Sequence, residues 1–175
     1  GQAVEPRQKI IRVLERLGRE KEIPAAYQAL IRAAPGRQQF RFELADYHIR
    51  QGDRGAAEKA LDDAAQRFRN DPYVLLEVAA YYSRWRFGEK ARRTYEEVLR
   101  REPREDGVII EVGDFYFDSG ERERAMEVWS GLPKSRLGEQ AGRERLAEIY
   151  VERGIMNQGL ALYAQLLEER PDDER

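Results

Sequence analysis

A pattern that recurs every 34 residues is the feature that most constrains the fold of this chain. Alanine or glycine follows an aliphatic residue at four positions with this spacing: Ala45, Ala79, Gly113 and Ala147. Three residues after each of them stands a histidine or a tyrosine, at His48, Tyr82, Tyr116 and Tyr150. A fixed period of this length is typical of proteins built from stacked supersecondary units. The period therefore predicts a repeat architecture.

The second half of each period follows the same spacing. Its large side chains stand 34 residues apart at Tyr27, Leu61, Tyr95, Trp129 and Tyr163. Its prolines recur every second period, at Pro35, Pro103 and Pro171. Apolar residues three and four apart, a glycine at the turn and a proline after the second segment indicate two amphipathic helices per period. We expect a single domain over residues 1–175 with five helix pairs, at residues 4–37, 38–71, 72–105, 106–139 and 140–173.

These positions resemble the tetratricopeptide repeat over essentially the whole chain. That 34-residue unit has small residues at its eighth and twentieth positions, an aromatic residue at its eleventh and a proline at its thirty-second. The resemblance implies an all-α, right-handed solenoid of about five antiparallel helix pairs, because one pair cannot bury its apolar face without a stacked neighbour. It also implies a non-catalytic protein-interaction scaffold, without a cofactor, in which the first helix of each pair lines a concave groove.

The groove positions of the family are carried onto this sequence by the resemblance. They form an apolar strip beside a ladder of carboxylates, and the residues expected to contact a partner are Phe42, Glu43, Asp46, Leu76, Glu77, Ile110, Glu111, Asp114 and Phe117. Like charges about 10 Å apart on stacked helices repel one another, and a cationic ligand would relieve this. The expected partner is a peptide or helix with apolar and basic side chains. The alternative is that the glutamates only form a solvated helix surface.

Segment 80–92, AYYSRWRFGEKAR, combines four aromatic with four positively charged residues and by itself suggests a nucleic-acid surface. Nucleic-acid binders usually carry a basic excess, whereas here 31 Lys and Arg face 33 Asp and Glu, for a net charge of -2. In the repeat register Tyr81 and Tyr82 become core positions. Nucleic acid is therefore not an expected partner. Secondary contacts with the expected partner are assigned to Arg84, Trp85 and Phe87 of this segment and to Arg50.

Two departures from the repeat pattern carry structural expectations. Arg86 stands where four other repeats have glycine, so we expect the turn of the third pair to be rebuilt and shielded by Trp85 and Phe87. Pro133 falls early in the fourth repeat. We therefore expect a short second helix there and a looser join to the fifth pair.

Catalysis is not expected. The one histidine, His48, occupies the slot that tyrosine fills in three other repeats, and the chain has no cysteine. Acidic pairs such as Asp62–Asp63 lie in helix-surface charge patterns, and no glycine-rich phosphate loop or metal-ligand cluster appears. The carboxylate clamp of chaperone-binding members of the family needs lysine, asparagine and arginine where this chain has Phe42 and Glu43. That function is not expected either.

Two alternatives stay open. The segment resembles periplasmic arrays of bacterial exopolysaccharide-export proteins, which implies binding of partner enzymes or guidance of a cationic polysaccharide. The other alternative is a self-assembling module, because four leucines of the last helix cannot all be buried against one neighbour: Leu160, Leu162, Leu166 and Leu167. No apolar run reaches the roughly 18 residues that a membrane span needs, and the compartment stays open. The charged, abrupt ends predict a piece of a longer protein, and the arginine-rich composition favours a bacterial source.

Overall fold

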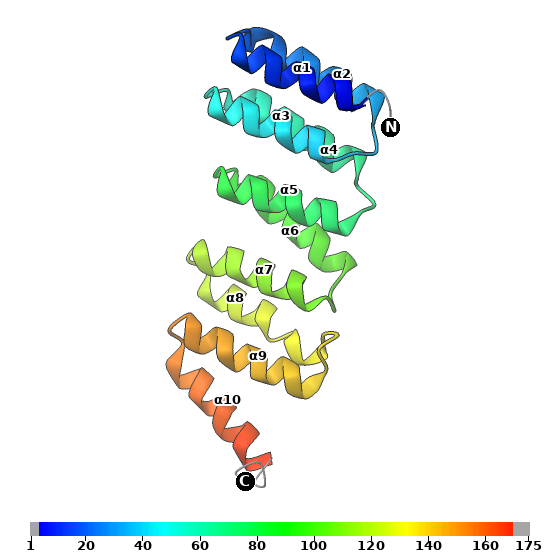
Figure 1. The fold of residues 1–175 in the computed structure, drawn as a ribbon. Coiled ribbons are helices and arrows are strands. Elements are labelled where there is room, and N and C mark those ends of the chain that lie inside the picture. The colour runs from blue at the N-terminus through cyan, green and yellow to red at the C-terminus, as the bar shows by residue number, and fades with distance from the viewer. Residues whose placement is uncertain (1–3, 170–175) are drawn as a thin grey trace. The chain divides into compact units, whose positions relative to one another are not determined.

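The structure is a computed structural model that describes residues 4–169. Ten α-helices and two short 3₁₀ helices connected by tight turns make up these residues, which contain no strand. Helices of a pair lie antiparallel and side by side, as α3 and α4 do in Figure 1. The expected all-α fold of antiparallel helix pairs is confirmed. Pro171 and the end of the fifth repeat lie outside the described residues.

The chain divides into two compact units, with the boundary between Thr94 and Tyr95, inside α6. The first unit contains α1 (Val4–Arg16), α2 (Ile23–Ala33), α3 (Gln39–Arg50), α4 (Arg54–Arg67), α5 (Pro72–Arg84) and the start of α6 (Gly88–Arg101). The second contains the rest of α6, α7 (Asp106–Asp118), α8 (Arg122–Trp129), α9 (Glu139–Glu152) and α10 (Met156–Glu169). The 3₁₀ helices η1 (Glu20–Glu22) and η2 (Leu132–Lys134) precede α2 and α9. A single continuous array of five repeats stays a prediction.

Aspartates fix the start of two helices in the first unit. The Asp53 carboxylate accepts a hydrogen bond from the backbone N–H of Ala56 at the start of α4. The Asp71 carboxylate accepts from the N–H groups of Tyr73 and Val74, and Pro72 occupies the first position of α5. Side-chain acceptors satisfy N–H groups that have no partner within the helix, and proline lacks such a group. Local sequence therefore sets these helix boundaries.

The turn between α5 and α6 is not rebuilt, so that expectation was wrong. The turns within four of the helix pairs place a glycine at positive φ, namely Gly18, Gly52, Gly120 and Gly154, and Arg86 takes the same conformation at φ 60° in the turn of the third pair. The hydrogen bonds match as well: Arg86 N–H donates to Ser83 O at 3.0 Å and Phe87 N–H to Tyr82 O at 2.8 Å. Gly52 and the residue after it make the equivalent pair of bonds. The repeat imposes the turn even where its sequence lacks the glycine.

Arg86→Gly is expected to stabilise the first unit by about 1 kcal/mol, because a side chain in the left-handed region crowds the following carbonyl and glycine does not. Arg86 is exposed, so little packing is lost with it. Urea unfolding of the two proteins checks this. The matched control is Gly52→Arg, which creates the same strain in the neighbouring turn and should destabilise by a similar amount. Equal stability of Arg86→Gly and the parent would contradict the strain.

Close contacts at glycines determine the packing of the second unit. Gly113 on α7 lies against the Trp129 indole of α8, whose Nε1 donates to the Ile110 carbonyl at 3.4 Å. The expected short second helix of the fourth pair is confirmed, since α8 has 8 residues. The expected loose join to the fifth pair was wrong. Gly142 on α9 packs so closely on η2 that a Cβ there would overlap the carbonyl oxygen of Leu132.

Candidate functional site

The first unit places several of the expected contact residues on neighbouring turns of α3 and α5. We define the α3–α5 face by Phe42, Asp46, Leu76, Glu77 and Tyr81. Phe42 is only 3% exposed, so it supports this face from below and offers little contact area itself. Asp46 and Leu76 are half-buried, and Glu77 is exposed. Partly covered apolar and acidic groups therefore lie together on one unit.

Tyr81 connects the two helices of this face. Its ring stacks on Phe42 with 4.9 Å between centroids and 6° between planes, and its hydroxyl donates to Asp46 Oδ2 at 3.3 Å. Burial is the main cause that raises the pKa of the Tyr81 phenol, and the Asp46 carboxylate adds to it. The sequence placed Tyr81 in the core, but its ring is only half-buried, unlike the buried Tyr47 and Phe115 at equivalent positions. Tyr81 is therefore a surface-forming residue that the repeat register did not reveal.

Trp85 and Arg84 extend the aromatic part of the α3–α5 face. The Trp85 ring meets Tyr81 edge-on at 4.9 Å, and the Arg84 guanidinium lies 5.2 Å from the centroid of the Tyr81 ring. Phe87 belongs elsewhere, since it contacts Tyr82 at 6.1 Å between ring centroids. The expected secondary contacts Trp85 and Phe87 are thus not brought together. Arg50, at the end of α3, is exposed.

Glu77 differs from the other carboxylates expected at the site. No hydrogen bond or ion pair joins it to any residue between 4 and 169, whereas Glu43 accepts a hydrogen bond from the Gln39 amide at 3.2 Å. Partial burial raises the pKa of the Glu77 carboxyl group. A carboxylate that loses some hydration without gaining a partner is disfavoured in its charged form. Glu77 is therefore the carboxylate on this face with the most to gain from an added cation.

Glu77→Gln is expected to increase the stability of the free protein at pH 7. Because the folded pKa is raised, folding disfavours the charged form, and this cost is present above the folded pKa and disappears below the unfolded value of 4.5. The gain should stay within about 0.5 kcal/mol, since water screens an exposed group. Urea unfolding at pH 7 and pH 3.5 measures it. A gain of equal size at both pH values would contradict a charge-dependent cause.

Asp114, the aspartate expected at the site in the second unit, has a partner within that unit. Arg153, the C-cap residue of α9, binds Asp114 at 2.8 Å and Asp118 at 3.1 Å. Its guanidinium also lies 5.4 Å from the centroid of the Phe117 ring. Burial still raises the pKa of Asp114, against the opposing effect of Arg153. Asp114 and Phe117 are therefore engaged by an arginine of the chain itself.

Glu111 and Ile110 lie on the same helix, α7, as half-buried residues. The Tyr95 hydroxyl donates to Glu111 Oε1 at 3.1 Å. Burial is the main cause that raises the pKa of Glu111, while the bond from Tyr95 acts against it. Glu111 thus has one neutral donor, and no lysine or arginine among the described residues forms an ion pair with it.

The contacts of Tyr81 and Arg153 share a spacing that sequence reasoning missed. Tyr81 lies 35 residues after Asp46 and 39 after Phe42, and Arg153 lies 35 residues after Asp118 and 39 after Asp114. Two residues that lie one helical turn apart on the first helix of a pair therefore contact the same residue in the next pair. Scanning the sequence for partners 35 and 39 residues apart would have found both pairings.

Other kinds of site find no support in the described part of the chain. No group of three or more histidine, aspartate or glutamate side chains among residues 4–169 is arranged to hold a metal ion. Within the same residues, every helix is too short or too polar to cross a membrane. His48 is half-buried, and burial lowers the pKa of its imidazole.

Comparisons with known proteins identify the fold. No protein-family model and no curated protein matches the sequence. Solved structures do match: a segment of MamA from Desulfovibrio magneticus superposes with a TM-score of 0.56 at 15% identity, covering 99% of each chain. A tetratricopeptide-repeat protein from Parabacteroides merdae gives a TM-score of 0.54 at 18% identity over 99% of this chain and 69% of that one.

A third structure, YrrB, is described as a tetratricopeptide-repeat protein with an unusual peptide-binding site. It superposes with a TM-score of 0.52 at 9% identity, covering 97% of this chain and 88% of YrrB. At such low identity these likenesses concern the fold alone. Together with the ten helices and the 34-residue period, they show that this chain has the solenoid fold of the tetratricopeptide-repeat proteins.

Proposed function

We propose that the chain is a non-catalytic protein-interaction scaffold whose α3–α5 face binds a peptide or helix with a basic residue next to apolar side chains. The observation that carries the proposal is Glu77, a partly dehydrated carboxylate without a partner, beside Leu76 and one helical turn from Tyr81. The peptide-binding site ascribed to YrrB, which has the same fold, supports a peptide as the kind of ligand.

The chemistry of the face favours a ligand with mixed character. A lysine or arginine would pair with Glu77, and the half-buried surface of Leu76, Tyr81 and Trp85 would take apolar side chains. Arg84 already covers part of the Tyr81 ring, so the basic group of the ligand would approach from the Glu77 side. An acidic peptide would gain no such pairing. Selectivity by charge is therefore the expected property of the site.

A random 12-residue peptide library selected on the protein tests this proposal. We expect the bound peptides to be enriched in lysine or arginine next to leucine or phenylalanine, and Glu77→Lys to weaken the tightest of them at least tenfold in calorimetry. Glu89→Lys is the matched control, because Glu89 is an exposed acid on α6 that is not one of the residues defining the α3–α5 face, and it should leave affinity unchanged. Equal loss in both variants, or enrichment of acidic peptides, would contradict the proposal.

The expected contacts on α7, Ile110, Glu111, Asp114 and Phe117, belong to the second unit and are proposed as a contact surface of that unit by itself. Asp114 and Phe117 are held by Arg153, so a ligand would have to displace this arginine to reach them. Ile110 and Glu111 are not so held and are the better candidates within this set. Within the second unit, a Glu111 variant should therefore weaken binding more than an Asp114 variant does.

Self-assembly is a second candidate function, favoured by apolar stripes on the first and last helices. Ile10 and Val13 on α1 and Leu17 directly after it are exposed, and Met156, Leu160 and Leu167 are exposed on α10. Between Lys9 and Leu17, three cations and one carboxylate give a charge of +2, whereas α10 carries two glutamates and no cation. We propose that α10 of one copy binds α1 of another.

Sedimentation velocity tests the self-assembly proposal. The parent protein should associate as its concentration rises, and Leu160→Glu should shift it to monomer. Arg12→Glu should weaken the association through the charge on α1. A parent protein that stays monomeric at high concentration would remove this candidate.

The polysaccharide alternative rests on the same carboxylates. A cationic oligosaccharide would meet Glu77 on the α3–α5 face, and Tyr81 and Trp85 would offer aromatic surfaces for a sugar ring. Titration with chitosan oligomers distinguishes it from the peptide proposal. Binding of these oligomers that Glu77→Lys abolishes would favour it, and lack of binding would leave the peptide.

A further inference from the structure

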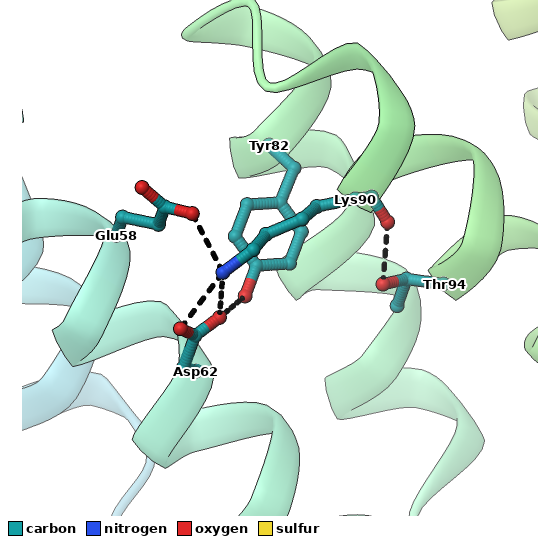
Figure 2. A network of polar contacts seen from close by, with 5 residues as sticks. All are labelled: Glu58, Asp62, Tyr82, Lys90 and Thr94. Atoms are coloured by element: carbon teal, nitrogen blue, oxygen red, sulfur yellow. Dashed lines mark hydrogen bonds and ion pairs between the residues drawn. The ribbon is translucent and has the colours of Figure 1, made fainter. Parts of the chain in front are cut away.

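A group of three side chains, an acid, a tyrosine and a cation, fills the junction between second helices in the first unit. The Tyr82 hydroxyl donates to Asp62 Oδ1 at 2.6 Å, and the Lys90 ammonium binds the two Asp62 oxygens at 2.6 and 2.8 Å (Figure 2). Lys90 also binds Glu58 at 2.7 Å and lies over the Tyr82 ring. The tyrosine ring and the lysine chain thus occupy the space between α4 and α6.

A related group occupies the equivalent positions 34 residues later in the second unit, where the cation, Arg124, pairs with Glu127 of its own helix. The Tyr116 hydroxyl donates to Glu96 Oε1 at 3.1 Å, and the Arg124 guanidinium lies 5.6 Å from the centroid of the Tyr116 ring. Two junctions with this chemistry show that the space between second helices is filled by side chains of the repeat itself.

One period earlier, the three positions hold residues that cannot form this group. Gln28, His48 and Ala56 stand 34 residues before Asp62, Tyr82 and Lys90. Ala56 has no chain to span the gap, and the His48 ring is shorter than tyrosine and has no hydroxyl. An open hollow of about 420 Å³ lies there between α2 and α4, with Gln28, His48 and Ala56 all in its lining. The hollow is therefore the space that the recurring group fills elsewhere.

The floor of this hollow is apolar, and one buried cation lies at its side. Ile31, Leu44 and Ala60 form the floor. Arg41 is only 4% exposed; its Nε donates to Asp63 Oδ2 at 2.6 Å and its Nη1 to the Pro35 carbonyl at 3.1 Å. Its Nη2 donates no hydrogen bond to a described residue.

The rim of the hollow adds a second cation. Lys59 is exposed there, so Arg41 and Lys59 together outweigh the one carboxylate of the lining, Asp63, which Arg41 already holds. His48 contributes no charge at neutral pH, because burial lowers the pKa of its imidazole. The hollow thus combines an apolar floor with a net positive charge, whereas the filled junction between α4 and α6 contains two carboxylates.

We propose that this hollow binds a small amphiphilic carboxylate, with its flat apolar body on the floor and its carboxylate toward Lys59 and Arg41. The volume lies within the range of about 300–1,000 Å³ that is usual for small-molecule sites. The ring of the ligand would take the place of the tyrosine ring in the filled junctions. The charge of the lining selects a carboxylate over an amine. This site is separate from the α3–α5 face and does not depend on the proposed peptide binding.

Titration with benzoate, followed by amide NMR shifts, tests this proposal. We expect saturable shifts at Ala56, Ala60 and His48 with a dissociation constant in the millimolar range, and none with benzylamine. Lys59→Ala should weaken benzoate binding about tenfold. Arg93→Ala is the matched control, since Arg93 is the exposed residue 34 positions after Lys59, and should leave binding unchanged. Absence of shifts, or equal binding by benzylamine, would overturn the proposal.

Filling the hollow provides an independent arm of the test. The triple variant Gln28→Asp, His48→Tyr and Ala56→Lys transfers the group of Asp62, Tyr82 and Lys90 into this junction and should abolish the benzoate shifts. Should that variant fail to fold, Ala56→Leu, which narrows the hollow by one side chain, should weaken binding. A folded triple variant that binds benzoate as the parent does would show that the ligand lies elsewhere.

Discussion

Gly113→Ala is expected to destabilise the second unit by about 2–3 kcal/mol, the upper part of the range for overpacked cores. A Cβ at this position would overlap the Nε1 and Cδ1 atoms of the Trp129 indole. Trp129 is fully buried between Phe117 and Tyr150, at 5.6 and 6.3 Å between ring centroids, so it cannot move aside at low cost. Urea unfolding, followed by far-UV circular dichroism, gives the stability difference.

A second substitution should restore the stability lost in Gly113→Ala. The equivalent pair in the first unit is Ala45 with Leu61, both of them fully buried, which shows that the repeat accommodates alanine opposite leucine. Trp129→Leu alone should leave a cavity and destabilise. In the Gly113→Ala background, Trp129→Leu should lower the free energy of unfolding much less, because the alanine methyl group fills part of the cavity that the smaller leucine leaves. Additive losses in the double variant would contradict direct contact between the two positions.

Asp63→Ala is expected to destabilise the first unit by about 2 kcal/mol, because it leaves the buried Arg41 guanidinium without its carboxylate. Arg41 is 4% exposed, whereas the Asp63 side chain is 56% exposed. This exposure gives water some access to the pair, so the expected loss lies below that of a fully buried ion pair. Urea unfolding at pH 7 measures the change.

The repeat again provides a rescue and a control. Leu75, 34 residues after Arg41, is buried on α5, so Arg41→Leu should restore most of the stability that Asp63→Ala removes. Glu97 is the residue 34 positions after Asp63, and it pairs with Arg101, which is itself partly exposed. Glu97→Ala should therefore change stability by no more than about 0.5 kcal/mol. A similar loss in the Asp63 and Glu97 variants would show that burial of Arg41 does not cause the effect.

The fold could be predicted from sequence because the 34-residue period constrains both helices and the turn at once. The period identified small residues such as Ala45 and Ala79, which are fully buried. The prediction for the turn at Arg86 was wrong, because the absence of glycine was taken to mean that the turn has a different conformation. The structure shows the left-handed conformation retained at φ 60°, with Arg54 donating to the Trp85 carbonyl at 2.6 Å and lying over the Phe87 ring.

The join after Pro133 was mispredicted for a similar reason. The early proline does shorten α8, but η2 continues the chain and Leu132 is fully buried. Gly142 permits α9 to approach this segment closely. The early Pro133 therefore correctly indicated a short α8, but it did not indicate a loose join. The glycine at position 142 was the sequence signal for close packing of α9 on η2.

The sequence predicted which positions lie on the first helices, but it did not predict which of their carboxylates are already paired with other side chains. The register placed Asp46, Glu77 and Asp114 on first helices, and they lie there. It did not indicate that Asp46 accepts a hydrogen bond from Tyr81 or that Arg153 holds Asp114, since these partners come from the next first helix. Side-chain pairing across helices therefore reduces the expected acidic strip to a few carboxylates, of which Glu77 is the least engaged.

Glu77 also connects stability with function. The substitution Glu77→Gln is expected to stabilise the free protein at pH 7 and to weaken a basic ligand. Functional sites often retain groups that are unfavourable in the unbound state. A variant with higher stability and lower affinity would fit this role, whereas a variant with unchanged affinity would assign Glu77 to the solvated surface.

The footprint of a bound peptide on the protein tests the peptide-binding proposal most directly. Methyl NMR during titration with a library-selected basic peptide should shift Leu76, Ala80 and Ile49, on α5 and α3, and the shifts should vanish in Glu77→Lys. Ile10 and Val13 on α1 and Leu160 on α10 should stay unchanged. Shifts confined to these terminal helices, with α3 and α5 unaffected, would contradict binding on the α3–α5 face.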